Sequence, residues 1–238
     1  RDRFDVVADY AFPLTLSVIA TLIGIPRRDL DRVKAWSLVI ADVLDYKRTW
    51  DVMAAGNRMT GEFTAYLAEL VAARRARPAN DLLTRLLAAV DDEAKLDEEE
   101  LIALCVMLLF AGHETTAGQA AWNVILMLQH PDFLALVQDE IDRLVPAGQM
   151  VDGRALHALT HLGYAVTETE RLRPSADMLL RDVDVAMEIG GYRIPAGWKV
   201  QVSAEIAHRL PDWFVGFDLY EKEKGYFFSG ERRNELFK

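Results

Sequence analysis

The chain has little cysteine, an excess of acidic over basic residues, and no apolar run of membrane-spanning length. Its 238 residues include one cysteine, Cys105, so no internal disulfide is possible and a reducing, cytoplasmic setting is expected. The formal net charge is -10, which argues against a nucleic-acid partner, because such proteins normally carry a basic face. The apolar runs at 11–24 and 101–111 are shorter than the ~20 residues that a membrane span requires. These features favour a soluble globular protein without a membrane partner.

Helical periodicity predicts a mainly α fold, and the chain shows no internal repeat and no low-complexity linker. Apolar residues recur at helical spacing over three early segments, 31–44, 51–74 and 82–90. Asn80 is expected to cap the third of these helices. Asp97 and Glu100 have the spacing of a capping box, and helical spacing then continues to Gln129. A helix this long and this apolar is expected to cross the interior of the protein.

The pattern changes after Pro174, where short strands are expected. Apolar and polar residues alternate over 183–189, which predicts a half-buried strand. Gly190 and Gly191 then favour a tight hairpin turn, and 198–204 is expected to form another strand. We therefore expect a small antiparallel sheet late in the chain. No domain boundary is visible, so residues 1–238 are expected to form a single domain.

The middle of the long helix carries the first candidate site. Gly112, Glu114 and Thr115 interrupt an apolar run, although a carboxylate is rarely buried without a partner. A threonine can bond to a carbonyl one turn earlier, and a glycine allows a flat ligand to approach the backbone. These residues predict a notch with an acid and an alcohol at its lip, a pair that could relay protons to a ligand. The alternative is that this stretch emerges into solvent.

Charged residues outside this helix form further candidates. Glu168 and Arg171 stand three apart and can form an ion pair, which is worth only ~0.2–0.5 kcal/mol if exposed; their apolar neighbours favour partial burial. Arg181 is either a solvated charge at the end of a strand or an anchor for an anionic group. His157 and His161 have a spacing that could bind a metal on a helix, but no third ligand is evident, so no metal site is predicted.

Four segments, in this order, resemble one known family. They are "AGHETT" at 111–116, "ETERLRP" at 168–174, the arginine ahead of the Gly-Gly turn, and "AHRLPDWF" at 207–214. Together they resemble the cytochrome P-450 haem-thiolate monooxygenases of the soluble bacterial type. The resemblance covers about Asp5 to Phe214 and implies a partial P-450 fold, with a long central helix and a small antiparallel sheet. The segment 215–238 departs from the family sequence.

The resemblance implies a role for each candidate residue. Thr115 would hold iron-bound dioxygen, and Glu114 would supply protons for cleavage of the oxygen–oxygen bond. Glu168 and Arg171 would form a buried structural pair. The haem contacts that the resemblance implies are Ala111, Gly112, Thr115 and Arg181. The implied function is oxygen insertion into a small lipophilic substrate, with haem as cofactor and electrons from a ferredoxin or flavoprotein partner.

The axial ligand of the family has no counterpart in this sequence. The family places a cysteine on a glycine-rich loop downstream of the "AHR" segment, but no cysteine follows Arg181. Cys105 belongs to the oxygen-side helix and cannot substitute, and the family's early helices have no counterpart before Arg1. Because thiolate ligation favours oxygen–oxygen cleavage, three interpretations stay open. The chain is a fragment of a full enzyme, an inactive relative, or a haem-free helper that kept the scaffold.

Overall fold

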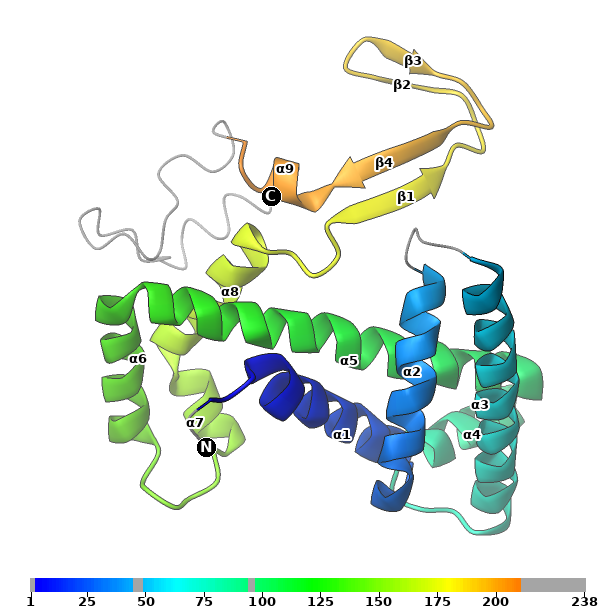
Figure 1. Cartoon of the computed structure of the whole chain (residues 1–238), viewed down its shortest axis with the longest axis horizontal. Coiled ribbons are helices and arrows are strands. Elements are labelled where there is room, and N and C mark those ends of the chain that lie inside the picture. Colours follow the sequence, from blue (N-terminus) through cyan, green and yellow to red (C-terminus); the bar gives the residue numbers. More distant parts are fainter. Residues whose placement is uncertain (1–2, 45–48, 94–96, 211–238) are drawn as a thin grey trace. The chain divides into compact units, whose positions relative to one another are not determined.

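The computed structural model describes residues 3–44, 49–93 and 97–210 (Figure 1). The described residues are mostly α-helical with two small antiparallel sheets, which confirms the predicted fold class. The chain divides into two compact units, Arg1–Ala117 and Gly118–Lys238. The division falls inside the longest helix, α5 (Glu98–Gln129). The single domain expected from the sequence therefore stays a prediction.

The first unit is built from helices. They are η1 (Val6–Ala11), α1 (Phe12–Ile23), η2 (Arg27–Asp29), α2 (Leu30–Leu44), α3 (Trp50–Ala76), α4 (Leu82–Glu93) and the first part of α5. The periodic segments of the sequence thus form α2, α3 and α4, as predicted. Helices α2 and α3 run side by side (Figure 1), and Trp36 of α2 stacks on Phe63 of α3 with 5.0 Å between ring centroids. Both rings are buried, so this contact forms part of the core.

One arginine ties the ends of three helices together. Gly24 ends α1 in the left-handed region with φ +99°, and its carbonyl accepts a hydrogen bond of 2.7 Å from Arg74 of α3. Arg74 Nε also donates to Asp81 at 2.5 Å, and Asp81 accepts from the main-chain N–H of Thr84. Burial raises the pKa of Asp81, but the hydrogen bonds from Arg74 and Thr84 outweigh it and hold the pKa below its usual range. Asp81 is thus the N-cap of α4, and the prediction of Asn80 is wrong by one residue.

The capping box predicted before α5 is confirmed. The main-chain N–H of Asp97 donates to the Glu100 carboxylate at 2.8 Å, and the N–H of Glu100 donates to the Asp97 carboxylate at 2.8 Å. Two N–H groups that the helix leaves unpaired are satisfied reciprocally. The helix that begins here continues to Gln129, the end point that the sequence predicts.

Among the described residues, two helices are long and apolar enough to span a bilayer by length and composition alone. They are Val6–Ile23, with mean hydropathy 1.8, and α5, with mean hydropathy 1.5. Helical residues flank both apolar runs, so each helix is longer than the run at 11–24 or 101–111 that the sequence argument considered. Pro13 does not break the helix because it stands in the first turn of α1, where no N–H is needed. A core helix passes the same test, so this finding is weak evidence for a membrane span.

The second unit combines the rest of α5 with shorter elements. They are α6 (Pro131–Leu144), α7 (Gly153–Ala158), α8 (Thr160–Leu172), β1 (Met178–Asp182), β2 (Met187–Ile189), β3 (Tyr192–Ile194), β4 (Lys199–Ser203) and α9 (Ala204–Ala207). Its apolar core joins Leu126 of α5 to Phe133 of α6 and Ala165 of α8. Glu140 of α6 is buried and accepts hydrogen bonds from the main-chain N–H groups of Thr160, His161 and Leu162. This carboxylate holds the start of α8 against α6.

The strands form two separate pairs, β1 with β4 and β2 with β3, both antiparallel. Gly190 and Gly191, with φ +58° and +80°, make the predicted two-residue turn between β2 and β3, which confirms it. The half-buried strand predicted over 183–189 is wrong. Strand β2 is only its last three residues, because Val183 instead joins a turn with Gly197 and Trp198 through main-chain hydrogen bonds.

Candidate functional site

The motif at 111–116 lies within regular α-helix in the middle of α5. Thr115 Oγ1 donates to the carbonyl oxygen of Ala111 at 2.6 Å, which is the bond to the preceding turn that threonine favours. The helix continues on both sides of this bond. The direction in which each motif residue points is therefore set by helical geometry.

Ala111 and Thr115 form an open face of α5. Both are exposed, and residues four apart lie on the same side of a helix. Ala103 and Met107 are also exposed and continue this face through the two preceding turns. Glu114 is beside this face, and its side chain is 32% exposed. A small side chain, a hydroxyl and a carboxylate thus adjoin one another at an uncovered part of the first unit.

Gly112 does not contribute to this face. A Cβ atom at Gly112 would lie 3.0 Å from both Cγ1 and Cδ1 of Ile19, on α1. The glycine thus allows α1 and α5 to approach each other closely. The gap for a flat ligand that the sequence predicts beside Gly112 is wrong, because Ile19 fills it. The open face belongs to Ala111 and Thr115 instead.

His113 is the buried polar residue of the motif. Its side chain is 0% exposed and contacts the ring of Phe12 edge-on at 5.1 Å between centroids. Its Nδ1 lies 2.7 Å from the carbonyl oxygen of Leu109, and its Nε2 lies 2.6 Å from Oγ of Ser37 on α2. Thr15 of α1 also donates to the His113 carbonyl at 3.1 Å. His113 therefore joins α5 to α1 and α2, a role that sequence reasoning missed.

Glu168 and Arg171 form an ion pair on α8 in the second unit. Two nitrogens of Arg171 donate to the two oxygens of Glu168, at 2.6 and 2.7 Å. The Glu168 side chain is 0% exposed and that of Arg171 is 12% exposed. This geometry is bidentate, which makes it one of the stronger kinds of ion pair.

The "AHR" segment extends this pair. Arg171 donates to the carbonyl of His208 at 3.0 Å, and Nδ1 of His208 donates to the carbonyl of Arg171 at 3.3 Å. Arg209 donates to the carbonyl of Leu172 at 2.7 Å and to Glu205. The last carbonyls of α8 are therefore held by the segment after β4. Sequence reasoning did not find this arrangement, because carbonyl acceptors leave no signal in side-chain identity.

Arg181 lies on β1 opposite Val200 of β4 and is exposed. Within the part of the chain that the structure describes, its guanidinium donates to the neighbouring carbonyl of Leu180 at 2.8 Å. Most of its donors therefore face solvent. An exposed guanidinium in this state can bind a carboxylate through two hydrogen bonds.

Cysteine and histidine residues do not assemble a metal site among the described residues. Cys105 is buried in α5, and burial raises the pKa of its thiol to about 11. His157 and His161 lie on different helices, α7 and α8, so the single-helix spacing considered from the sequence does not arise. His157 instead contacts the carbonyl of Gly153, and His161 contacts the Glu140 carboxylate.

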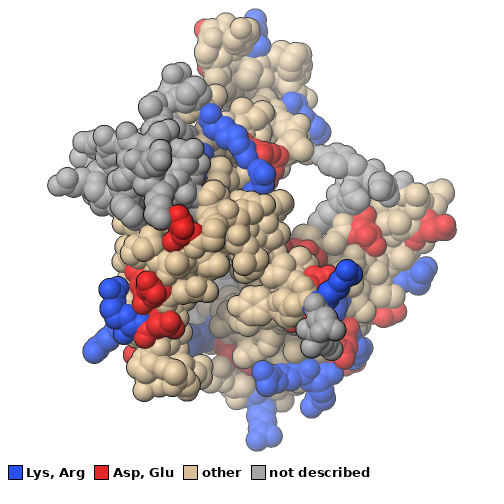
Figure 2. All heavy atoms as spheres, turned by 60° about the vertical axis from the view of Figure 1, so that its left-hand side comes forward, with Lys and Arg blue, Asp and Glu red and all other residues tan. Residues whose placement is uncertain are grey.

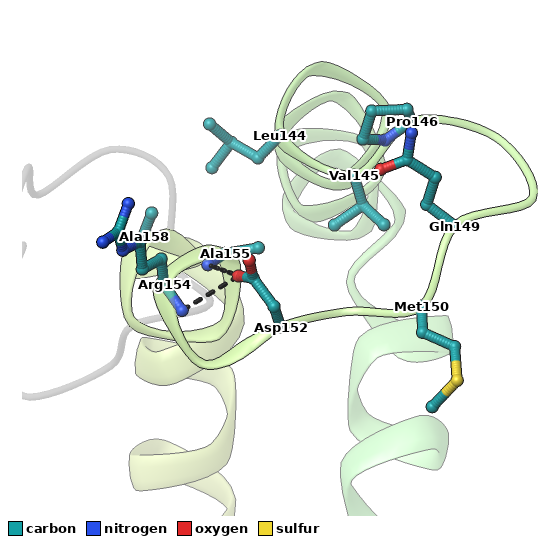
Figure 3. Close-up of a pocket in the computed structure, with 9 residues that line it drawn as sticks. All are labelled: Leu144, Val145, Pro146, Gln149, Met150, Asp152, Arg154, Ala155 and Ala158. Atoms are coloured by element: carbon teal, nitrogen blue, oxygen red, sulfur yellow. Dashed lines mark hydrogen bonds between the residues drawn. The ribbon is translucent and has the colours of Figure 1, made fainter.

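A surface pocket of about 340 Å³ lies in the second unit, where α6 connects to α7 (Figure 3). Leu144, Pro146 and Met150 contribute apolar walls. Its carboxylate, Asp152, accepts hydrogen bonds from the main-chain N–H groups of Arg154 and Ala155 and so caps α7. The residues that line the pocket include none of the candidate residues. On the face shown in Figure 2, acidic and basic side chains are interspersed.

Comparison with known proteins identifies one family. The family described as Cytochrome P450 matches residues 31–215. The "Biotin biosynthesis cytochrome P450" of Bacillus subtilis is 30% identical over 93% of this chain and 51% of its own length. "Cytochrome P450 107B1" of Saccharopolyspora erythraea is 32% identical over 93% of this chain and 49% of its own. The chain thus spans about half the length of the curated relatives it matches.

Solved structures of the same family share the fold. A crystal structure of P450BioI in complex with hexadec-9Z-enoic acid ligated acyl carrier protein matches with a TM-score of 0.77 and 30% identity. The match covers 93% of this chain and 52% of the P450BioI chain. Myxobacterial CYP267B1 in complex with myristic acid matches with a TM-score of 0.75 and 33% identity, over 92% of this chain and 49% of that one.

Proposed function

Because the chain belongs to the cytochrome P450 family, we propose that it supplies the oxygen side of a haem-dependent monooxygenase site. The reaction is insertion of an oxygen atom from dioxygen into a small lipophilic substrate. Electrons come from a ferredoxin or a flavoprotein, and the setting is cytoplasmic. The observation that carries the proposal is the exposed face of Ala111 and Thr115 with the half-buried Glu114 carboxylate beside it.

The ligands of similar structures support a lipophilic substrate. One relative was crystallised with hexadec-9Z-enoic acid on its carrier protein and another with myristic acid, and both ligands are long-chain fatty acids. On this chain, exposed Met107 and Ala103 continue the face of Thr115 along α5 with apolar side chains. An apolar substrate would be held by such a surface through burial of hydrocarbon.

Each unit, taken by itself, holds residues whose chemistry suits one part of a haem. In the first unit Ala111 offers a small side chain beside the Thr115 hydroxyl, and in the second unit the exposed guanidinium of Arg181 suits a carboxylate such as a propionate. The iron ligand is a different matter. Cys105 is 1% exposed, and its thiol has a pKa of about 11, so it is not available as a thiolate. The residues present fit the oxygen face and the propionate anchor, but they do not include an axial thiolate.

Bound haem supplies the iron at which dioxygen is activated. The chain's own part is to hold and move protons next to that position. The Thr115 hydroxyl donates its hydrogen bond to the Ala111 carbonyl, so the Thr115 oxygen can accept a further hydrogen bond. The Glu114 carboxyl is partly exposed, so water can reach it. None of the similar proteins reported above supports the alternative of a haem-free helper.

The visible absorption spectrum of the purified chain tests the proposal directly. Added haem should give an intense Soret band that saturates with one haem per chain. A spectrum that remains that of free haem would contradict the assignment. An intact-mass measurement of the same sample shows which termini the tested protein has.

Thr115→Ala should uncouple oxygen reduction from substrate oxidation in a completed enzyme, in which this chain is joined to a segment that carries the axial cysteine and is supplied with reduced ferredoxin. Loss of the hydroxyl that positions the proton relay should lower product per dioxygen consumed by about tenfold or more, since positioned proton-transfer groups contribute about 10²–10⁴-fold. Thr116→Ala is the matched control, because it removes the neighbouring exposed hydroxyl from a different side of α5. Equal coupling in the two variants would contradict the role given to Thr115.

A further inference from the structure

The proposed reaction leaves one buried polar group of the motif without a role. His113 lies between the residues that face α1 and those that face outward, and it is 0% exposed. Both of its ring nitrogens are within hydrogen-bond distance of a partner, at 2.7 Å for Nδ1 and 2.6 Å for Nε2. Its aromatic neighbours Phe12 and Phe110 contact it edge-on, so they fix the ring plane.

The two partners determine where the ring carries its proton. The partner of Nδ1 is the carbonyl oxygen of Leu109, which can only accept. Nδ1 must therefore carry the hydrogen. In the neutral ring this leaves Nε2 with a bare lone pair, which accepts a hydrogen bond from the hydroxyl of Ser37. Every polar atom of the Ser37–His113 pair is then satisfied.

This tautomer affects the residue next to it. Glu114 Oε1 lies 3.8 Å from His113 Nε2, which is beyond hydrogen-bond distance. Because Nε2 is an acceptor, it offers no hydrogen to the carboxylate. A ring that carried a hydrogen on Nε2 would be drawn towards Glu114 as a donor, and a doubly protonated ring would form an ion pair with it. The Leu109 carbonyl disfavours the first outcome, because Nδ1 has to donate to it, and the Ser37 hydroxyl, which is 1% exposed, occupies the Nε2 lone pair of the neutral ring.

We propose that Ser37 and His113 are positioning residues for Glu114. The Leu109 carbonyl sets the Nδ1–H form of His113, and Ser37 donates to Nε2 of that form. His113 in that form leaves the Glu114 carboxylate without an intramolecular donor on this side. The carboxylate then remains available to the face of Thr115. This inference rests on the proposed function for the importance of Glu114, whereas the tautomer itself rests only on the contacts of Ser37, Leu109 and His113.

Nitrogen NMR of the histidine rings tests the tautomer in the purified chain, without haem or turnover. The chain has five histidines, and loss of one signal pair in His113→Gln assigns His113. We expect Nδ1 to show the shift of a protonated ring nitrogen and Nε2 that of a bare one. A proton on Nε2, or averaging between the two forms, would overturn the proposal.

Ser37→Ala tests the dependence on the hydroxyl. The His113 nitrogen shifts should move towards the doubly protonated form, because Nε2 loses its donor while Nδ1 keeps the Leu109 carbonyl. Ser17→Ala, which removes a hydroxyl from α1, should leave the shifts unchanged. Ser37→Thr keeps a hydroxyl and should restore the wild-type shifts. In the double variant Ser37→Ala/Glu114→Gln the doubly protonated form should be lost, because its partner is removed. Wild-type shifts in Ser37→Ala would refute the role of Ser37.

If Ser37→Ala fails to fold, Glu114→Gln provides the second measurement. Its side chain is partly exposed, so this substitution should be tolerated. Glu114→Gln alone should leave the His113 shifts of the wild type unchanged, and a change would overturn the proposal by showing that Glu114 is already a partner. Failure of the proposed function gives a different result from failure of this inference. A missing Soret band with the expected tautomer would reject the haem site and leave the Ser37–His113 arrangement in place.

Discussion

Glu168→Ala should strongly destabilise the chain, because it leaves a partly buried guanidinium without its carboxylate. Glu168 is 0% exposed and binds Arg171 through two hydrogen bonds of 2.6 and 2.7 Å. Removing one partner of a buried ion pair costs about 3–5 kcal/mol. For a chain of this length each kcal/mol lowers the melting temperature by roughly 2–4 °C, so the expected drop is roughly 6–20 °C. Arg171 keeps its hydrogen bond to the carbonyl of His208 in this variant, so we do not expect the melting temperature to drop by more than this range.

Thermal unfolding followed by circular dichroism measures this drop, and an exposed ion pair provides the control. Asp182 and Lys199 join β1 to β4 and are 71% and 70% exposed. Asp182→Ala should cost less than about 1 kcal/mol, because exposed pairs contribute little. The double variant Glu168→Leu/Arg171→Met should recover part of the loss, since apolar replacements remove the unpaired charge as well.

The reasoning is refuted if the melting temperature of Glu168→Ala lies as close to that of the parent as the melting temperature of Asp182→Ala does. That result would mean that the guanidinium of Arg171 finds water or another acceptor at little cost. If Glu168→Ala gives no soluble protein, Glu168→Gln carries the measurement, because its amide oxygen still accepts one hydrogen bond. Its melting temperature should fall between those of Glu168→Ala and the parent.

Two further predictions concern the first unit. The pKa of Asp81 is lowered below its ordinary value of 3.8. Its contact with Arg74 therefore stabilises the chain fully at pH values well above 3.8, and this stabilisation is lost as the pH falls through the lowered pKa. The difference in urea midpoint between parent and Asp81→Asn should therefore be large at pH 7 and shrink below about pH 4; a constant difference would contradict it. Gly112→Ala should destabilise by about 1–2 kcal/mol, as overpacking against Ile19 exceeds the helix propensity gained. Gly61→Ala, with no atom within 4 Å of its added methyl among the described residues, should stabilise by about 0.5–1 kcal/mol, and equal shifts in the two variants would refute the close approach.

Features set by a few neighbouring residues could be predicted from the sequence. The capping box at Asp97 and Glu100 depends on side chains and N–H groups within one turn, and the structure has both of its hydrogen bonds. Gly190 and Gly191 predict their turn because both must adopt positive φ. The N-cap of α4 shows the limit of this method. Asn80 and Asp81 are both good capping residues, and the arginine that favours Asp81 comes from α3.

Features set by distant partners could not be predicted. Helix α5 is apolar on nearly every side in its first half, so periodicity does not indicate which side of the motif is buried. His113 is buried because Ser37, 76 residues earlier, supplies a hydroxyl to it. Strand prediction over 183–189 failed for a similar reason. Its alternation has the period of a strand, but among the residues that the structure describes most of it pairs with no other strand, and Val185 is 74% exposed.

The outward side of α5 is determined by what packs behind it. Ile19 of α1 occupies the space beside Gly112, and Ser37 of α2 holds His113, so two successive residues of the motif are fixed from the inner side. Since a helix turns by a fixed angle per residue, fixing these two also fixes Glu114 and Thr115 on the outer side. A substitution in α1 or α2 that shifts the inner contacts must therefore rotate or displace the acid and the alcohol together. The separation between Glu114 and Thr115 is set by the geometry of the helix itself. Their orientation depends on how the helices of the first unit pack against α5.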